Sequence, residues 1–190
     1  MIASIKNTLV GYTKTGKSSY IYYLIHKRVY ENPLPTIGGA FFMYKYNNIQ
    51  FQIWDTSGDE IYLGLLPMYI RNAKIAMLFY DITNYKTFEG AKELQKTQDP
   101  FKNKDYFYIL IGNKIDLLEN RQVSYEEGKQ FAQELKAQFF EVSSLTGEGV
   151  LESFELIYRE YLQYYLNKED NKKLSGQNHI KRKNRNCCIF

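Results

Sequence analysis

The stretch from Gly11 to Ser18 has the residue types and the spacing that bind phosphate groups. Its sequence fits the pattern Gly-x-x-x-x-Gly-Lys-[Ser/Thr]. The glycines let the backbone turn tightly, so that successive N–H groups point at phosphate oxygens. In this pattern Lys17 reaches the terminal phosphates and the Ser18 hydroxyl can ligate Mg²⁺. The expected phosphate contacts are Thr13, Lys14, Thr15, Gly16, Lys17, Ser18 and Ser19.

A second candidate element is Trp54-Asp55-Thr56-Ser57-Gly58, which ends a predicted strand. A carboxylate at such a strand end, opposite a helix N-terminus that holds phosphates, can hold a metal-bound water. Gly58 leaves its backbone N–H free to approach the terminal phosphate. Taken alone, Asp-Thr-Ser-Gly is equally well an ordinary turn. Downstream of a phosphate loop, it predicts Asp55 as a magnesium ligand that acts through water.

Asn113-Lys114-Ile115-Asp116 follows a predicted buried strand and supplies what a base-reading site needs. The Asp116 carboxylate can accept hydrogen bonds from both the N1–H and the exocyclic amine of guanine. Adenine offers an acceptor at the ring position and no such amine, so the motif selects guanine. A kinase or an ATPase with the same phosphate loop would lack this motif, which therefore argues against both classes.

These residues need elements that bring them together, and the sequence predicts strands and helices in alternation. Continuous apolar runs are typical of strands buried on both faces, and Asn47-Asn48 predicts a tight hairpin. The pattern is that of an α/β protein with a mostly parallel sheet and one antiparallel edge pair, in which ligands bind at the carboxyl ends of the strands. The predicted strands are 4–10, 40–46, 49–55, 74–80, 106–112 and 138–142, and the predicted helices are 17–27, 85–96, 125–136 and 150–166.

Length and charge distribution narrow the class of protein further. The 190 residues suit one domain, and no apolar run reaches the roughly 18 residues that cross a membrane. Residues 168–190 carry seven Lys/Arg and two acids, hence +5, which leaves 4 − 5 = −1 for residues 1–167. A nucleic-acid-binding protein would place its positive charge on the folded surface. We therefore expect no nucleic acid, a cytosolic folded part and a basic tail that meets a membrane.

The three motifs, in this order and context, resemble those of the small GTPases of the Ras superfamily. The resemblance covers roughly residues 4–166 and the last few residues. It implies the P-loop NTPase fold, with a six-stranded mostly parallel sheet, one antiparallel edge strand and helices on both faces. It also implies GTP or GDP and Mg²⁺ as ligands, with Thr36 joining Ser18 on the metal. Lys17, Thr36 and the position of Asp59 are the implied catalytic residues.

The resemblance also assigns roles around the base. Asn113 would tie the base loop to the phosphate loop, and the stem of Lys114 would cover the base. A last loop, made of Ser143, Ser144 and Leu145, would contact the base, with the Ser144 N–H donating to the guanine oxygen. The family usually has lysine where this chain has Leu145, so one polar contact is removed.

Residues 35–41 resemble switch I of the Rab branch, and together with residues 65–71 they look most like the early-endosomal Rabs. When the γ-phosphate leaves, the Thr36 contact would go and the loop would loosen. Where the family places an aromatic ring against guanine this chain has Val29, and whether the neighbouring Tyr30 substitutes is open. The aromatics that such Rabs show to effectors match Phe41, Trp54 and Tyr69, for which an ordinary core role is the alternative.

Two residues depart from the family near the phosphates. Where the family has a glutamine that orients the attacking water, this chain has Asp59. A carboxylate about 5 Å from one unit of phosphate charge is repelled by about 3 kcal/mol at an effective dielectric near 20, so Asp59 should swing out or acquire a proton. We expect slow unaided hydrolysis. Lys14 replaces a small residue, and its side chain either points to solvent or offsets the charge of Asp59 at the phosphates.

The C-terminal Cys187-Cys188-Ile189-Phe190 fits a prenylation box, and both cysteines are candidates for lipidation. The basic run at 181–185 would add about 1 kcal/mol per charge at an anionic membrane surface. A solvated tail with incidental cysteines is the alternative. We expect a GTPase domain over residues 1–166 and a flexible basic tail over 167–190.

Together these features predict a Rab-type switch that binds and hydrolyses GTP and recruits effectors in vesicular and endosomal traffic. The implied partners are an exchange factor, a GTPase-activating protein, effectors and the prenylation and membrane-extraction machinery. We expect a monomer at the cytoplasmic face of endosomal or vesicle membranes, with a cytosolic pool. The alternatives are a GTP-loaded scaffold with negligible turnover and, more distantly, a P-loop kinase.

Overall fold

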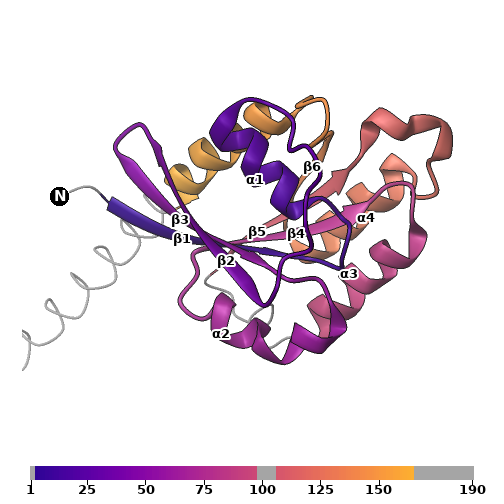
Figure 1. The fold of residues 1–190 in the computed structure, drawn as a ribbon, viewed down its shortest axis with the longest axis horizontal. Helices are drawn as coiled ribbons and strands as arrows, with labels where there is room; N and C mark the ends of the chain where they lie inside the picture. The colour runs from indigo at the N-terminus through magenta and orange to yellow at the C-terminus, as the bar shows by residue number, and fades with distance from the viewer. Residues whose placement is uncertain (1–2, 98–105, 165–190) are drawn as a thin grey trace, which may run out of the picture. The chain divides into compact units, whose positions relative to one another are not determined.

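The strands and helices of the chain follow the predicted alternation. The computed structural model describes residues 3–97 and 106–164 (Figure 1). The strands are β1 (Ala3–Val10), β2 (Gly39–Tyr46), β3 (Ile49–Thr56), β4 (Ile75–Asp81), β5 (Phe107–Asn113) and β6 (Gln138–Val142). The helices are α1 (Lys17–His26), α2 (Leu66–Ile70), α3 (Tyr85–Thr97) and α4 (Tyr125–Leu135), with the 3-10 helices η1 (Glu60–Leu65) and η3 (Ile115–Asn120). A last helix begins at residue 150 and is described as far as residue 164.

The strands form one sheet in the order β2-β3-β1-β4-β5-β6. The edge strand β2 is antiparallel to β3, and the other neighbouring pairs are parallel, which confirms the predicted sheet. The chain divides into two compact units, residues 1–153 and 154–190, and the site described below lies in the first. The predicted tail of residues 167–190, with Cys187 and Cys188, lies outside the described residues.

Strand β4 is central to the core, because all seven of its residues are buried. Successive side chains of a strand point to opposite faces. Phe79 meets Tyr20 of α1, with ring centroids 5.3 Å apart, whereas Leu78 and Tyr80 belong to a cluster that includes Phe88 of α3. Helix α1 accordingly lies on one side of the sheet, and α2 and α3 lie on the other (Figure 1). This packing holds the strands whose carboxyl ends carry the site.

Two differences from the predicted elements affect the site. Strands β4 and β5 each end one residue later than predicted, at Asp81 and Asn113, and these two residues are partners in the sheet register. Helices η1, α2 and η3 occupy segments for which we predicted no element. In the first two, Gly64 and Pro67 obscure a helical pattern. Pro67 stands in the first turn of α2, where its missing N–H removes no helical hydrogen bond.

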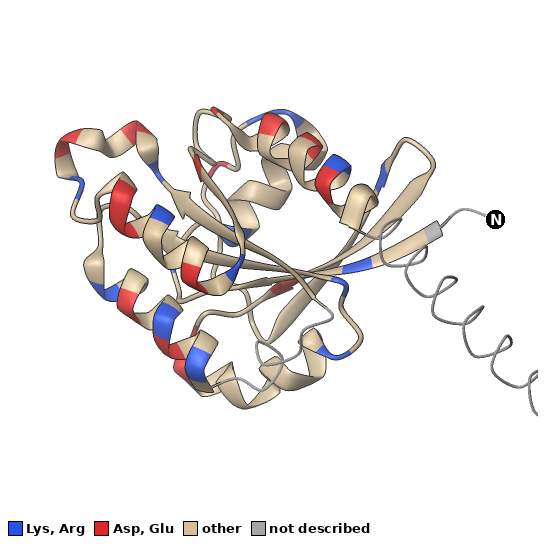
Figure 2. Ribbon diagram, turned by 180° about the vertical axis from the view of Figure 1, so that it is seen from behind, with Lys and Arg blue, Asp and Glu red and all other residues tan. Residues whose placement is uncertain are grey.

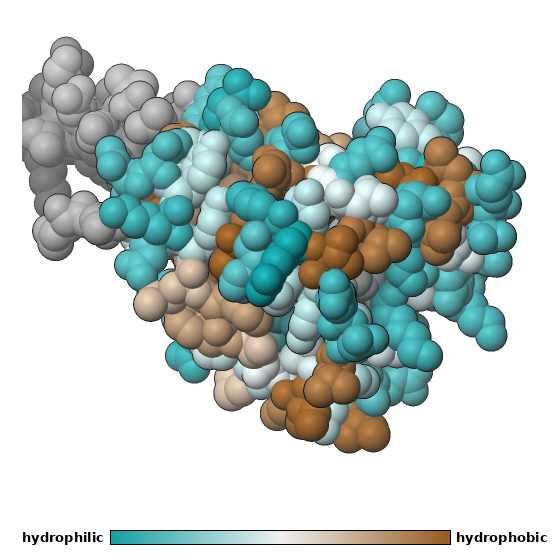
Figure 3. All heavy atoms as spheres, turned by 45° about the horizontal axis from the view of Figure 1, so that its top comes forward, coloured by the Kyte–Doolittle hydropathy of each residue, from teal (hydrophilic) through white to brown (hydrophobic). Residues whose placement is uncertain are grey.

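The most exposed large apolar side chains stand in the segments that border the phosphate loop. Leu34 and Ile37 before β2 are each 80% exposed, and Ile61 in η1 is 82% exposed. On the face presented by Figure 3, apolar groups are separated by polar ones. None of the helices described is both long enough and apolar enough to pass through a lipid bilayer.

Candidate functional site

The phosphate loop joins β1 to α1 and depends on two glycines. Gly16 has φ 87°, and a Cβ built on it would lie 2.1 Å from Nδ2 of Asn113. A Cβ on Gly11 would lie 2.4 Å from the carbonyl oxygen of Phe79. Gly16 caps α1 without a side-chain hydrogen bond, which leaves the N–H groups of the first turn available to an anion. The other expected contacts lie in this loop (Thr13, Lys14 and Thr15) and in the first turn of α1 (Ser19).

Lys17 is folded back over the loop that precedes it. Its Nζ donates hydrogen bonds to the carbonyl oxygens of Gly11 at 2.7 Å and of Tyr12 at 2.9 Å. Burial lowers the pKa of Lys17 to about 8, and the charge of Asp55 opposes this shift. A buried ammonium held by carbonyl oxygens gains from a neighbouring anion, so the position suits a phosphate group.

Ser18, Thr36 and Asp55 meet at one point beside the start of α1. The Ser18 hydroxyl donates to Oδ2 of Asp55 at 2.6 Å, and the Thr36 hydroxyl donates to the same oxygen at 3.0 Å. Burial raises the pKa of Asp55, whereas the hydrogen bonds from both hydroxyls and the charge of Lys17 lower it. These contacts bring together oxygen ligands from α1, from the loop before β2 and from β3.

This group of oxygens fits Mg²⁺. Magnesium prefers oxygen ligands, and in phosphate sites it uses one or two carboxylates together with phosphate oxygens. Asp55 is 1% exposed, and its Oδ1 has no hydrogen-bond partner. A buried acceptor of this kind needs a donor, which a metal-bound water provides. Within residues 3–97 and 106–164, no group of three or more His, Cys, Asp or Glu could hold a metal. A metal here would therefore rely on the single carboxylate of Asp55, the two hydroxyls and oxygens of the bound ligand.

The segment after β3 touches the phosphate loop through its backbone. The N–H of Thr13 donates to the carbonyl oxygen of Gly58 at 2.9 Å. A Cβ on Gly58 would lie 2.2 Å from the carbonyl carbon of Tyr12, so a side chain does not fit there. The ring of Tyr12 in turn covers Gly90 of α3, where a Cβ would meet it at 2.3 Å. The start of this segment is therefore held against the phosphate loop.

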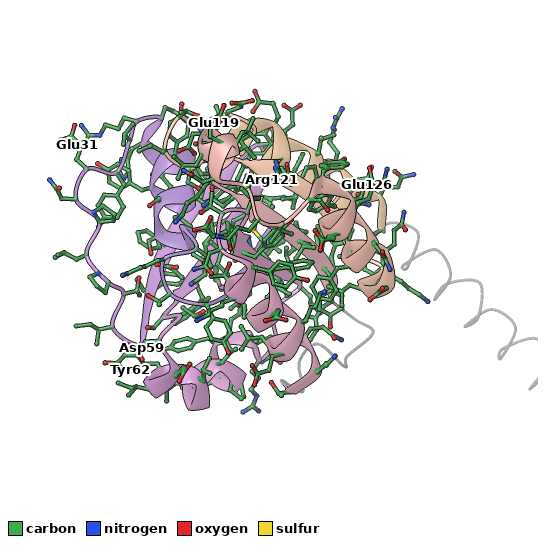
Figure 4. The ribbon with its side chains drawn as sticks, turned by 90° about the vertical axis from the view of Figure 1, so that its right-hand side faces the viewer. Glu31, Asp59, Tyr62, Glu119, Arg121 and Glu126 are labelled. Carbon is green, nitrogen blue, oxygen red and sulfur yellow. The ribbon has the colours of Figure 1, made fainter. Side chains whose placement is uncertain are left out.

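Asp59 caps the short helix that follows it. Its Oδ1 accepts a hydrogen bond from the N–H of Ile61 at 3.0 Å, at the N-terminus of η1. The side chain is exposed, and Figure 4 shows it beside Tyr62 at the edge of the molecule. The carboxylate is therefore exposed and engaged at the N-terminus of η1.

Asn113 connects the phosphate loop to both loops expected to hold the base. Its Nδ2 donates to the carbonyl oxygen of Thr15 at 2.8 Å. Its Oδ1 accepts from the N–H of Lys114 at 2.8 Å and from the N–H of Ser144 at 2.9 Å. The tie implied by the family resemblance is therefore present. The Ser144 N–H, expected to donate to guanine, already has this partner and would have to share it.

Asp116 is held by the loop after β6. The Ser143 hydroxyl donates to its Oδ1, and the same hydroxyl oxygen accepts from the N–H groups of Leu145 at 3.2 Å and Thr146 at 3.0 Å. These bonds fix the direction of the carboxylate. Leu145, which stands where the family has a lysine, is 55% exposed.

Asp81 is a site residue that the sequence analysis missed. Its Oδ2 lies 2.6 Å from Nζ of Lys114, and it is buried at the end of β4. The ion pair fixes the lysine stem that is expected to cover the base. A signal was available in the sequence, because Asp81 ends a buried parallel strand next to the one that ends at Asn113.

Tyr30, the neighbour of Val29, packs against helix α1. The Tyr30 ring stacks on Tyr22 of α1, with centroids 4.4 Å apart and an interplanar angle of 11°. Val29 is 40% exposed. The ring of Tyr30 is therefore already in contact with α1.

The three aromatics expected at the effector surface form one cluster. The ring centroids of Phe41 and Trp54 are 5.1 Å apart, and those of Trp54 and Tyr69 are 5.6 Å apart. Phe41 is 47% exposed, and Trp54 and Tyr69 are half-buried. The cluster therefore lies at the surface and is not part of the core.

Comparison with known proteins gives relatives of one kind. A sequence model described as the Ras family matches residues 6–163, which include every site residue described above. The chain is 39% identical over 166 residues to Ras-related protein Rab5A of Oryza sativa subsp. japonica, covering 85% of this chain and 82% of that protein. It is 36% identical over 163 residues to Ras-related protein Rab-17 of Mus musculus, covering 83% and 76%. It is 39% identical over 153 residues to Ras-related protein RABF2a of Arabidopsis thaliana, covering 78% and 76%.

Proposed function

The chain belongs to the Ras family and is a Rab-type small GTPase, and from this premise we propose that it binds GTP or GDP with Mg²⁺ at the loops described above. Its family membership makes it a GTPase switch in membrane traffic. The observation that carries the nucleotide site is the convergence of Ser18, Thr36 and Asp55 beside the phosphate loop. Three segments that are distant in sequence supply three oxygens at one point. A phosphate-loop hydroxyl and a nearby carboxylate are the groups that hold Mg²⁺ in enzymes that transfer phosphate groups.

The phosphates would occupy the loop between β1 and α1. The N–H groups of the first turn of α1 and the ammonium of Lys17 would hold the negative charge. Ser18 and Thr36 would bind Mg²⁺ directly, and Asp55 would bind it through a water. When bound, Mg²⁺ neutralises charge on the phosphate oxygens. Lys17 and Thr36 would thus stabilise the negative charge that develops in the transition state, because the fold already holds them in place.

The base would be read by Asp116, which Ser143 holds in place. Its carboxylate accepts two hydrogen bonds from guanine and finds no such donors on adenine. The stem of Lys114, fixed by Asp81, would cover one face of the ring. On the other face, where the family places an aromatic ring, this chain would offer Val29 instead.

Thr36 would couple the nucleotide state to the surface. It belongs to the loop before β2, in which neighbouring Ile37 is 80% exposed. With the γ-phosphate present, its hydroxyl would stay at the metal; after hydrolysis it would leave and the loop would loosen. Effectors that contact Phe41, Trp54 and Tyr69 next to this loop would then distinguish the two states.

Hydrolysis without a partner would be slow. Asp59 is engaged with Ile61 at the helix cap, so it does not orient an attacking water. A GTPase-activating protein can raise such a rate by roughly 10³–10⁵ through an arginine. A GTP-loaded scaffold with negligible turnover is the second candidate, favoured by this same contact, and the rate of a single turnover separates the two.

The cellular setting follows the relatives. We expect endosomal or vesicle membranes, an exchange factor, an activating protein, effectors and the machinery for prenylation and membrane extraction. Lipids on Cys187 and Cys188, next to the basic run, would give the two signals that stable anchoring needs.

A competition experiment tests the proposed function. Fluorescent GDP is bound to the protein with Mg²⁺, and GTP, GDP and ATP compete for the site. GTP and GDP should displace the label, and ATP should not. Asp116→Asn should weaken guanine binding by about tenfold to a hundredfold, because one acceptor becomes a donor. Glu119→Gln, the same chemical change at an exposed residue of η3, is the matched control. Displacement by ATP, or equal affinities of the two variants, would contradict the proposal.

A further inference from the structure

Three strands present side chains in rows on one face of the sheet. In the first row, Phe41 of β2 is paired with Trp54 of β3. In the second row, two residues further along the strands, Gln52 of β3 lies between Met43 of β2 and Lys6 of β1. Residues two apart on a strand share a face, as do residues directly opposite on neighbouring strands. Phe41 and Met43 are 47% and 60% exposed. An aromatic row and a more polar row therefore lie side by side at the surface.

Next to the aromatic row lies a hollow of about 450 Å³, which we call the basic hollow. It is lined by Ser4 and Lys6 of β1, Gln52 of β3, and Arg71, Asn72 and Lys74 of the loop that precedes β4. Its three ionisable side chains are all cations. The ion pairs found within the described residues use other cations, Lys114 and Arg121. Figure 2 shows a Lys or Arg position, in blue, on the strand that leads to the N-terminus. The lining thus offers positive charge and polar groups without a carboxylate.

Lys6 connects the basic hollow to the aromatic cluster. Its Nζ donates to the carbonyl oxygen of Arg71 at 2.8 Å and lies 5.3 Å from the centroid of the Trp54 ring. Burial also lowers the pKa of Lys6. One cation is therefore partly removed from water at the boundary between apolar and basic surface, where an anion would restore the lost solvation.

We propose that this face binds a segment of a partner protein in which acidic side chains stand next to an aromatic or aliphatic anchor. The anchor packs on Phe41, Trp54 and Tyr69, and the carboxylates enter the basic hollow. The two rows are two strand residues apart, which is roughly 7 Å and close to one helical turn. In the partner segment, the acids would therefore stand one turn from the anchor if it is a helix, or two residues from it if it is a strand. The proposal rests on the proposed function, because the partner is an effector of the nucleotide switch.

Charge argues against the chain's own tail as the occupant. Residues 168–190 carry +5, so they are repelled by Lys6, Arg71 and Lys74. A nucleic acid is also a poor match, since its phosphates favour a row of cations along a groove. Here three cations converge on one hollow beside aromatic rings. Acidic and apolar groups in one protein segment match both parts of the face.

Selection from a phage-displayed random-peptide library tests this inference. The full chain is loaded with a non-hydrolysable GTP analogue, and loading is measured first, which tests the proposed function separately. Selected peptides should combine acidic residues with an aromatic or aliphatic residue. Lys74→Glu should load nucleotide normally and bind these peptides roughly tenfold more weakly. Lys86→Glu, an equal charge change at an exposed position of α3, should bind them as the unchanged protein does.

A charge exchange separates recognition from a structural effect. Replacing a single acid of a selected peptide by lysine should weaken binding to the unchanged protein, and for the acid that faces residue 74 it should recover part of the binding to Lys74→Glu. The inference is overturned if a loaded protein selects no peptides or selects neutral or basic ones. It is equally overturned if Lys74→Glu and Lys86→Glu bind the selected peptides alike.

Discussion

Asp59 offers the sharpest test of how this protein hydrolyses GTP. A carboxylate held about 5 Å from the γ-phosphate would be repelled by about 3 kcal/mol. In the structure the side chain is exposed and bound to the N–H of Ile61, so water screens most of that repulsion. We therefore attribute the slow hydrolysis that we propose to the lack of a group that orients water, and only in small part to charge.

Two substitutions separate these causes. Asp59→Asn removes the charge, keeps the length and preserves the cap, because Asn and Asp are similarly good N-cap residues. Asp59→Gln also removes the charge, but it adds the methylene that lets an amide reach toward the site. We expect Asp59→Gln to speed single-turnover hydrolysis of preloaded GTP by about 10²-fold, at the low end of the range for a positioned proton-transfer group. Asp59→Asn should stay within about twofold of the unchanged protein.

The cap supplies a control on folding. Losing an N-cap side chain costs about 1 kcal/mol, so Asp59→Ala should loosen η1 without speeding hydrolysis, as amide hydrogen exchange at Ile61 would report. The reasoning is refuted if Asp59→Gln hydrolyses GTP no faster than the unchanged protein. It is also refuted if Asp59→Asn is as fast as Asp59→Gln, since the charge alone would then be responsible.

Four other predictions concern the nucleotide site. Val29→Phe should slow GDP release about tenfold in a stopped-flow assay by adding a stacking ring, and an unchanged rate would show that this face of the base is already covered. Gly16→Ala should lower the free energy of unfolding by roughly 2 kcal/mol or more in urea titrations, because of its φ of 87° and the contact with Asn113. Since burial lowers the pKa of Lys17 to about 8, the free protein loses this positive charge above that pH. Its nucleotide affinity should then fall by up to about tenfold per pH unit, and a constant affinity in titrations up to about pH 9.5 would contradict this. Lys14→Ala should reduce GTP affinity only if the ammonium reaches the phosphates, and equal affinity would assign that side chain to solvent.

The residues that define the fold were predictable because local pattern and burial agree. The apolar run of β4 favours a strand buried on both faces, and the glycines of the phosphate loop favour a tight turn. The motif of Asn113 and Asp116 was predictable in its location for the same reason, since it stands at the end of the buried strand β5. What remained unpredicted depends on contacts distant in sequence. The stacking of Tyr30 on Tyr22, and the pairing of Asp81 with Lys114, require two segments to be placed first.

The basic hollow could not be predicted from the sequence. Lys6, Arg71 and Lys74 are ordinary surface residues in the sequence. They become a group only because β1 pairs with β4 in the sheet, which brings the loop before β4 next to β1. Similarly, the hydrogen bond that Asp59 accepts from the N–H of Ile61 depends on helix η1. The sequence did not indicate this helix, because Gly64 interrupts its pattern.

The shared side chain of Asn113 implies cooperativity between the two halves of a nucleotide. One amide fixes Thr15 of the phosphate loop and Ser144 of the base loop, so ordering either loop reduces the conformational entropy that the other must still lose. Guanosine and pyrophosphate, added as separate molecules, should therefore each bind more tightly when the other is present. Calorimetric titration of one in the presence of the other measures this coupling, which is zero if the loops order independently. The intact nucleotide would gain affinity beyond the sum of its parts, and an exchange factor that separated the loops at this amide would weaken both halves at once.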